Sequence, residues 1–257
     1  MKYLAPSALT ISLFFPLLSQ AATLTIPEAE YLTGSLCMLS QRMAKDYMAI
    51  GAGIRPDEAM KDLDESIATF EMRYQTLLEY SENNASGKSI QAIGTAWEHY
   101  RNNIISPPSQ AKAISIIKES EELLAICDSA VAFIAHQSNS PIAQLIEVSE
   151  HGTTLTQKIA KYYFALYWNV DGKTLKQDFD KSVKEFDDSL NSLTTSSSNT
   201  TEISAALAKV KSQWKFSNSG FKLDEQGHFV PTVISVTSES IFNKMSAVAI
   251  MYEKLAD

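Results

Sequence analysis

The chain has 257 residues, with 22 Lys and Arg against 30 Asp and Glu, which gives a formal net charge of −8. This acidic balance argues against nucleic acid or an anionic membrane surface as a partner, because phosphate groups attract basic proteins. The length is sufficient for two domains of ordinary size. The nine glycines and eight prolines lie mostly between periodic apolar segments, which indicates an all-helical protein.

The first residues have the form of a secretory signal. Lys2 supplies the charged end, residues 11–18 the apolar run, and Ser19-Gln20-Ala21 a small-x-small cleavage site. The apolar run is shorter than the ~20 residues that a spanning helix needs. We therefore expect residues 1–21 to be a signal peptide. The mature protein is expected in the periplasm, or secreted, with no membrane span.

A block of the chain occurs twice with an offset of 116 positions. Residues 39–45, Leu-Ser-Gln-Arg-Met-Ala-Lys, recur at 155–161 as Leu-Thr-Gln-Lys-Ile-Ala-Lys. The same offset pairs Phe70 with Phe186, and one residue more pairs Trp97 with Trp214. A repeat of this length indicates duplication of a whole folding unit, so we predict one domain over 22–139 and a second over 140–257.

Each half is predicted to contain four amphipathic helices. Apolar residues recur at alternating steps of three and four, as in Leu32, Leu36, Leu39 and Met43. The predicted helices cover residues 27–52, 57–82, 88–105, 109–138, 141–170, 172–195, 201–219 and 231–256. Four such helices joined by short loops form an up-down-up-down bundle, so we predict an all-α protein of two tandem four-helix bundles. The sequence leaves open whether the halves form separate bundles or exchange helices.

No pattern typical of catalysis, metal binding or cofactor attachment is present. The four histidines lack metal-ligand spacing, and there is no Cys-x-x-Cys-His motif, nucleophile elbow or phosphate loop. Glu98-His99 and Glu150-His151 are sequence neighbours on different helix faces and are expected at the surface. Trp97 and Trp214 are equivalent in the repeat and are expected in the core. We therefore predict no enzyme, no cofactor and no metal.

Residues Gly34–Lys45 resemble the opening helix of the PilJ/NarX-type sensor domain. The family pattern is roughly Gly-x-x-Arg-Met-x-Ser-x-Arg, and Gly34, Met38, Ser40 and Arg42 match it. That domain is the periplasmic input module of nitrate/nitrite sensor kinases and of type IV pilus chemotaxis transducers. With both halves counted, the resemblance implies two tandem copies in a soluble exported protein.

The resemblance also implies a ligand site on the first helix. In nitrate-sensing members, the first arginine of the motif binds the anion between the first helices of a dimer. Cys37 stands at that position here, and a thiol cannot give the forked, charged hydrogen bonds of a guanidinium. This departure argues against nitrate sensing by the family mechanism. The candidate ligand-binding residues are Ser40, Gln41, Arg42, Lys45 and Lys158.

The predicted function follows from this resemblance and from the missing catalytic groups. We predict a non-catalytic sensor-like binding protein that takes a small ligand such as an anion. Its partner would be a membrane chemoreceptor, a sensor kinase or a transporter, or a second copy in a homodimer. The alternative is a structural or interaction scaffold in the periplasm.

A disulfide between Cys37 and Cys127 is also predicted. They are the two cysteines of the chain, and an exported protein folds in an oxidising compartment. They fall at the same depth on antiparallel neighbouring helices, and Cys37 lies on a small-residue face that would let the backbones approach. The alternative is a pair of buried free thiols, which pack as small apolar groups.

Overall fold

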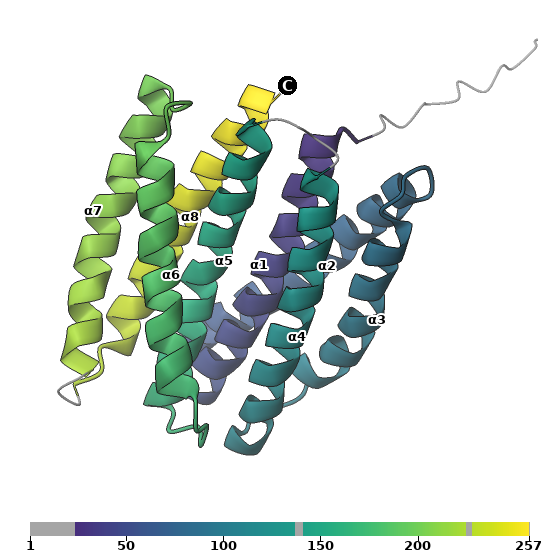
Figure 1. The fold of residues 1–257 in the computed structure, drawn as a ribbon. Coiled ribbons are helices and arrows are strands. Elements are labelled where there is room, and N and C mark those ends of the chain that lie inside the picture. The colour runs from purple at the N-terminus through teal and green to yellow at the C-terminus, as the bar shows by residue number, and fades with distance from the viewer. Residues whose placement is uncertain (1–23, 137–140, 225–227, 257) are drawn as a thin grey trace, which may run out of the picture.

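The computed structural model describes residues 24–136, 141–224 and 228–256 (Figure 1). These residues form eight helices and no strand, which confirms the predicted all-α fold. The helices are α1 (Ile26–Gly51), α2 (Pro56–Ser81), α3 (Gly87–Ile104), α4 (Gln110–Ala135), α5 (Pro141–Tyr167), α6 (Leu175–Thr195), α7 (Thr201–Asp224) and α8 (Pro231–Ala256). The predicted signal segment lies outside the described residues. Within the described ranges, no helix is long and apolar enough to cross a membrane.

The helices form two rings of four. In the first ring α1 packs on α2 and α4, and α3 closes it by packing on the same two helices. In the second ring α5 packs on α6 and α8, and α7 closes it. Successive helices are antiparallel in both rings (Figure 1). The architecture is thus two up-down-up-down bundles, and α1 and α5 keep the partners of their own half.

The two bundles are joined through their first helices. The contact between α1 and α5 is the most extensive between any two helices. Gly34 lies beside Glu150 near the start of both helices, and Gly51 lies beside Trp168 near their ends. The helices α1 and α5 therefore run side by side in the same direction, as Figure 1 shows.

This second contact buries α1 and α5 on all sides. Between Thr33 and Ala49 every residue except Arg42 is buried. Between Ser149 and Ala165 the same holds for all but His151 and Lys158. The sequence predicts one apolar stripe on each helix, which is correct for the face toward its own bundle. The opposite face is covered too, because each first helix packs against the other bundle.

The interior of each half is built around an aromatic pair. The rings of Phe70 and Trp97 stack with 4.2 Å between their centroids, and those of Phe186 and Trp214 lie 4.4 Å apart. Both tryptophans are 5% exposed, which confirms their predicted place in the core. The residues that the sequence repeat aligns therefore contact each other in both bundles, with the rings stacked at 24° in the first and tilted at 50° in the second.

A tyrosine closes the lower end of each bundle. The hydroxyl of Tyr47 donates to Pro107 O at 3.3 Å and accepts from Ser109 N at 3.2 Å, in the loop before α4. The hydroxyl of Tyr163 accepts from Val230 N at 2.7 Å, in the loop before α8. Each first helix is thereby fixed to the start of its fourth helix.

One helix is longer than predicted. Helix α7 continues to Asp224, past the predicted end at residue 219. Phe221 is buried against Phe179 and Tyr163, with centroid distances of 5.1 and 5.9 Å. This aromatic contact holds the last turn in place although Gly220 precedes it.

The predicted disulfide is wrong, because Cys37 and Cys127 are both buried free thiols. The Cys37 thiol donates a weak hydrogen bond to Thr33 O at 3.5 Å. Burial, with the Cys127 thiol nearby, raises the pKa of Cys37 well above its usual value. Helix α1 approaches α5 closely at Gly34, which faces Glu150. The small-residue spacing therefore serves the contact between the bundles and does not bring α4 within disulfide distance.

Candidate functional site at the α1–α5 interface

Helices α1 and α5 lie close together where Gly34 faces Glu150. A Cβ atom added to Gly34 would lie 2.9 Å from Cβ of Glu150 and 3.3 Å from its Oε2. Such distances are shorter than carbon and oxygen atoms tolerate in packed interiors. The two positions are also equivalent in the sequence repeat. One of them must be glycine for the helices to come this close while the other carries a long side chain.

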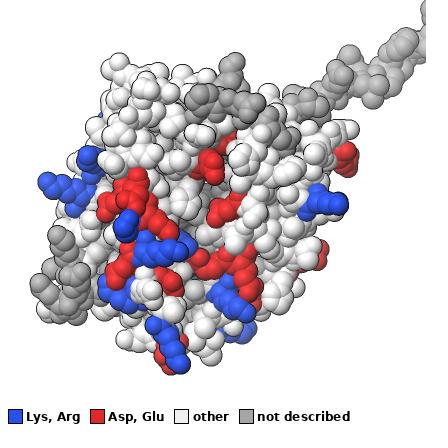
Figure 2. Space-filling view, viewed as in Figure 1, with Lys and Arg blue, Asp and Glu red and all other residues white. Residues whose placement is uncertain are grey.

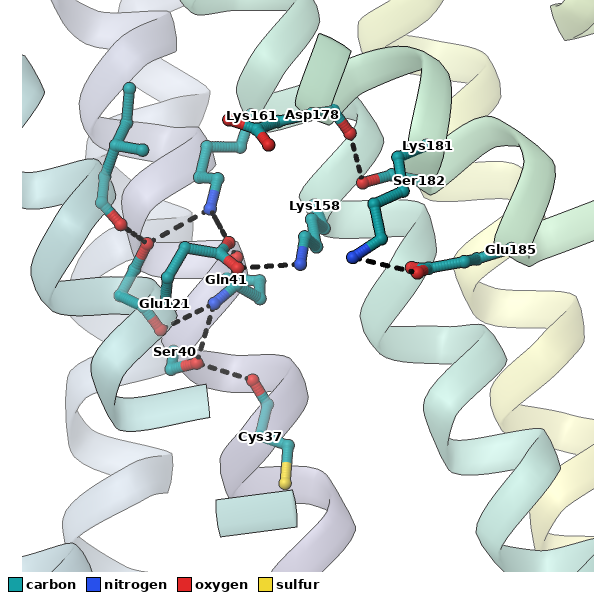
Figure 3. A network of polar contacts seen from close by, with 12 residues as sticks. Cys37, Ser40, Gln41, Glu121, Lys158, Lys161, Asp178, Lys181, Ser182 and Glu185 are labelled. Atoms are coloured by element: carbon teal, nitrogen blue, oxygen red, sulfur yellow. Dashed lines mark hydrogen bonds and ion pairs between the residues drawn. The ribbon is translucent and has the colours of Figure 1, made fainter. Parts of the chain in front are cut away.

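A charged cluster lies further along the interface, where α5 faces α4. Lys161 is completely buried and donates to Gln41 Oε1 at 2.6 Å, to Ser120 Oγ at 3.1 Å and to Glu121 Oε1 at 2.5 Å. Lys158 pairs with the other carboxylate oxygen of Glu121 at 2.7 Å. Figure 3 shows both lysines extending from α5 toward this carboxylate. A glutamate of the first bundle is therefore held between two lysines of the second.

The electrostatics of this cluster fit a fully ionised group. Burial alone would raise the pKa of Glu121, but the charges of Lys161 and Lys158 lower it to about 2. Burial lowers the pKa of Lys161 to about 8, against the attraction of Glu121. At neutral pH the carboxylate and the lysine both carry their charges, so the contact is an ion pair inside the protein.

A second cluster reverses the roles of the two bundles. Lys45 on α1 pairs with Glu239 on α8, and its Nζ lies 3.1 Å from Asp46 Oδ1. Arg42 pairs with the same glutamate at 3.1 Å and with Asp62 of α2 at 3.3 Å. Against the effect of burial, Lys45 and Arg42 lower the pKa of Glu239. Here a glutamate of the second bundle is held between two basic residues of the first.

The two clusters are related by the repeat. Lys45 and Lys161 are equivalent positions, as are Arg42 and Lys158. Each first helix thus reaches across to a glutamate on the fourth helix of the other bundle. Buried ion pairs pay a large desolvation cost and are best known for fixing which surfaces pair and in what register. The arrangement can therefore hold α1 and α5 in one relative position.

All five predicted ligand-binding residues lie at this interface. Ser40 donates to Cys37 O at 2.7 Å, and Gln41 donates to Ser120 O at 2.8 Å. Each predicted basic residue, Arg42, Lys45 and Lys158, has a carboxylate partner of the protein itself. An anion at these groups would have to compete with fixed carboxylates. Their role in ligand binding stays a prediction.

A cavity opens near the Gly34–Glu150 contact. Its volume is about 530 Å³, and it is lined from four helices, by Gly34 and Cys37 of α1, Asp128 of α4, Glu147 and Glu150 of α5 and Ser189 of α6. It lies in the groove between α4 and α6, on the face drawn in Figure 2. Cavities of this size accommodate small organic ligands.

The prediction that Glu150 lies at the surface is wrong, because this residue is only 5% exposed. Burial raises its pKa to about 8, against the attraction of Arg73. The signal that could have revealed it is the repeat, because Glu150 aligns with the glycine of the family pattern, a position of close helix contact.

A comparison with known protein families finds a match in the first bundle. Residues 31–121 match the PilJ family model. Its description is the N-terminal domain of type IV pili methyl-accepting chemotaxis transducers. No curated protein and no solved structure matches the chain.

The match places the first-helix site inside the PilJ domain. It contains Cys37, all four predicted residues of α1 and Glu121. The match includes Gly34–Lys45, so the resemblance of this segment to the PilJ family is confirmed within residues 31–121. That the second bundle is a further copy, and that the domain is of the NarX type, remain predictions.

Proposed function

We propose that the protein is a non-catalytic sensory binding protein of the periplasm, in which the α1–α5 interface detects a small ligand. The observation that carries this proposal is the buried, charged contact between the first helices of the two bundles, with a cavity beside it. A second copy of the PilJ module would supply α5, so both first helices belong to one chain.

The contacts at the interface allow α1 and α5 only a few positions relative to each other. Lys161 and Lys45 each pair with a glutamate of the opposite bundle, which requires that glutamate to lie at the right height along the interface. Packed interfaces of this kind shift between discrete arrangements and do not deform gradually. A ligand that fits one arrangement better than another would shift their populations. The shift could then be read by a membrane chemoreceptor, sensor kinase or transporter.

The contact between α1 and α5 within one chain also affects whether a second copy of the protein is needed as a partner. The family resemblance implies that two first helices from two chains meet around the ligand. Here α1 and α5 already make that kind of contact within one chain. A homodimer is therefore not required to build the site, and we propose a monomer that docks on a membrane partner.

The alternative is a scaffold that uses only its helical surfaces. One experiment separates the two functions, a thermal-shift screen of the purified protein against small anions, amines, amino acids and sugars. A ligand present at about 100 times its dissociation constant adds ~2.7 kcal/mol to stability, which is easily detected.

The localisation and the partners of the protein are tested in cells that express it. Fractionation should place the protein in the periplasm, and chemical cross-linking there should capture a receptor, kinase or transporter. A blank screen combined with no such partner would reject the sensory function in favour of the scaffold.

A further inference from the structure

The cavity beside Gly34 is acidic. Asp128, Glu147 and Glu150 line it, and none of its lining residues is Lys or Arg. Figure 2 shows acidic side chains in the middle of this face without a basic neighbour, whereas acidic and basic side chains are mixed below them. The rest of the lining includes Val131 and Val148. The cavity therefore combines acidic side chains with an apolar wall.

Glu150 is the inner carboxyl group of the cavity. It is 5% exposed, and among the residues that the structure describes its carboxyl group has no hydrogen bond and no ion pair. Arg73 of α2 attracts its charge but is not paired with it, while Glu253 of α8 repels it. Native proteins rarely leave a buried polar group unsatisfied, because an unpaired one is costly.

A second unsatisfied carboxyl group lies next to it. Glu30, one turn before Gly34 on α1, is 1% exposed, and neither of its oxygens has a hydrogen-bond partner. It is close enough to Glu147 and Glu150 for their charges to interact. Three glutamates thus converge on one end of the interface, and one of them, Glu30, is fully buried without a hydrogen-bond partner.

We propose that this cavity binds a small aliphatic amine in its protonated form, with the ammonium group donating to Glu150 and Glu147. The proposal rests on the proposed function and names the ligand class for it. An ammonium group offers three donors, enough for a hydrogen bond to each of these two carboxyl groups. The methylene part of the amine would pack on Val131 and Val148.

Other cations fit the site less well. Within the described residues, no group of three His, Cys, Asp or Glu side chains is placed to hold a metal ion. No Phe, Tyr or Trp lines the cavity, so it lacks the aromatic faces that bind quaternary ammonium groups. Nitrate carries the wrong charge for a cavity lined by three carboxyl groups.

The site also predicts how binding depends on pH. Burial raises the pKa of Glu30 and of Glu150 to about 8, so both are largely protonated at neutral pH in the empty cavity. An ammonium ion stabilises the charged form, so its binding releases protons and tightens as pH rises toward 8. The charged or titratable groups around these carboxyls are Tyr31, Arg73, Asp128, Glu147, His151 and Glu253. Arg73 is the basic group that opposes the ammonium.

The test is titration calorimetry of the full exported chain with 1,4-diaminobutane. The controls are 1,4-butanediol, which has the same length without charge, and potassium nitrate. We expect the diamine to bind, with affinity higher at pH 8 than at pH 6.5 and with proton release measurable in buffers of different ionisation enthalpy. We expect neither control compound to bind.

Variants locate the site. Glu150→Gln keeps the shape and removes the charge, and we expect it to weaken diamine binding by at least about tenfold, the effect of one strong charged contact. Glu147→Gln changes a half-buried residue and should weaken binding similarly if Glu150→Gln does not fold. Glu122→Gln is the matched control, because Glu122 lies on the exposed side of α4, paired with Lys118. It should leave the affinity unchanged.

The outcomes separate this proposal from the proposed function. No diamine binding, or equal binding by the folded glutamine variants, overturns the amine site. Binding of nitrate in its place would overturn the amine site and leave the sensory function standing. Only a blank result for every ligand class, together with no membrane partner, removes both.

Discussion

Lys161 of α5 donates to Glu121 of α4 at 2.5 Å, although the two residues belong to different bundles. Lys45 of α1 makes the mirrored contact to Glu239 of α8. The two lysines occupy equivalent positions of the repeat, so the same position in each half forms an ion pair with a glutamate of the other half. The joint between the bundles is therefore specified by charge as well as by apolar packing, and it can be tested as an energetic unit.

The first prediction is that Lys161 and Glu121 are strongly coupled. A double-mutant cycle with Lys161→Met and Glu121→Gln, followed by urea unfolding, should give a coupling energy of ~1.5–3 kcal/mol, the range for hydrogen bonds between charged groups. The lysine has no access to water, so its loss is not compensated by solvent.

The control is the exposed pair Lys118 and Glu122 on the same helix as Glu121. The same cycle there should give about 0.5 kcal/mol or less, as for other exposed helix pairs. Equal coupling for the two pairs would show that the interface cluster contributes no more than a surface contact.

The second prediction concerns acid. The pKa of Glu121 is lowered to about 2 in the folded protein, from a value of 4.5 without its partners. The unfolded chain therefore binds this proton first as pH falls, so the stabilisation is complete above about pH 5 and is lost as pH falls toward 2. Thermal unfolding between these pH values should show a steeper loss for the wild type than for Glu121→Gln. Parallel curves would contradict the pKa shift.

The sequence predicts the fold well because the fold depends on local signals. Turn residues such as Gly53 and Pro56 mark the helix ends, and the three-four spacing marks the face toward each bundle's own core. The second buried face of α1 carries Thr33, Ser40, Gln41 and Lys45, which look like surface residues when read alone. The residue pattern of α1 alone does not predict that α5 will cover this face.

The sequence predicts only part of the site, because its remaining residues are brought together by contacts between distant segments. Arg42 and Lys45 were selected through the family resemblance, and both lie at the interface. Their partners Glu121 and Glu239 were missed, because a glutamate on a helix is normally solvated and its burial depends on a distant segment. Glu150 was placed wrongly by the same general tendency, although its alignment with Gly34 carried the relevant signal.

The third prediction tests the correction at the cysteines. Cys37 and Cys127 are free and buried, so the denatured, unreduced protein should react with two equivalents of a thiol reagent, and the native protein should react slowly. A reducing agent should leave the melting temperature unchanged. Absence of titratable thiols in the denatured protein would instead indicate the disulfide.

The fourth prediction is that Glu150→Gln stabilises the protein at alkaline pH. The pKa of Glu150 is about 8 when folded and 4.5 without burial, so the folded protein holds a proton that the unfolded chain has released. Stability from this group is therefore present at low pH and declines as pH rises from about 5 to 8. The amide carries no charge, so its variant should lose less stability over this range.

The measurement is the melting temperature of both proteins at several pH values without ligand. The wild type and the variant should be closest near pH 5 and diverge toward pH 8, with the variant the more stable. Glu122→Gln should follow the wild type throughout, because Glu122 is exposed. A variant that is less stable at pH 8 would mean that the carboxylate is stabilised by the surrounding groups.

The fifth prediction addresses the close contact between Gly34 of α1 and Glu150 of α5. Gly34→Ala places a Cβ 2.9 Å from Cβ of Glu150, so the helices must separate or the glutamate must move. We expect a loss of ~1–3 kcal/mol in urea unfolding, the usual cost of overpacking. Gly87→Ala is the matched control, since the nearest atom to its Cβ would be 3.5 Å away. Alanine is the better helix former, so the control should be neutral or stabilising. Combining Gly34→Ala with Glu150→Gly moves the small residue to the other helix, and the double variant should be more stable than the sum of the two single losses predicts. Additive losses would show that the two repeat-equivalent positions do not share one contact.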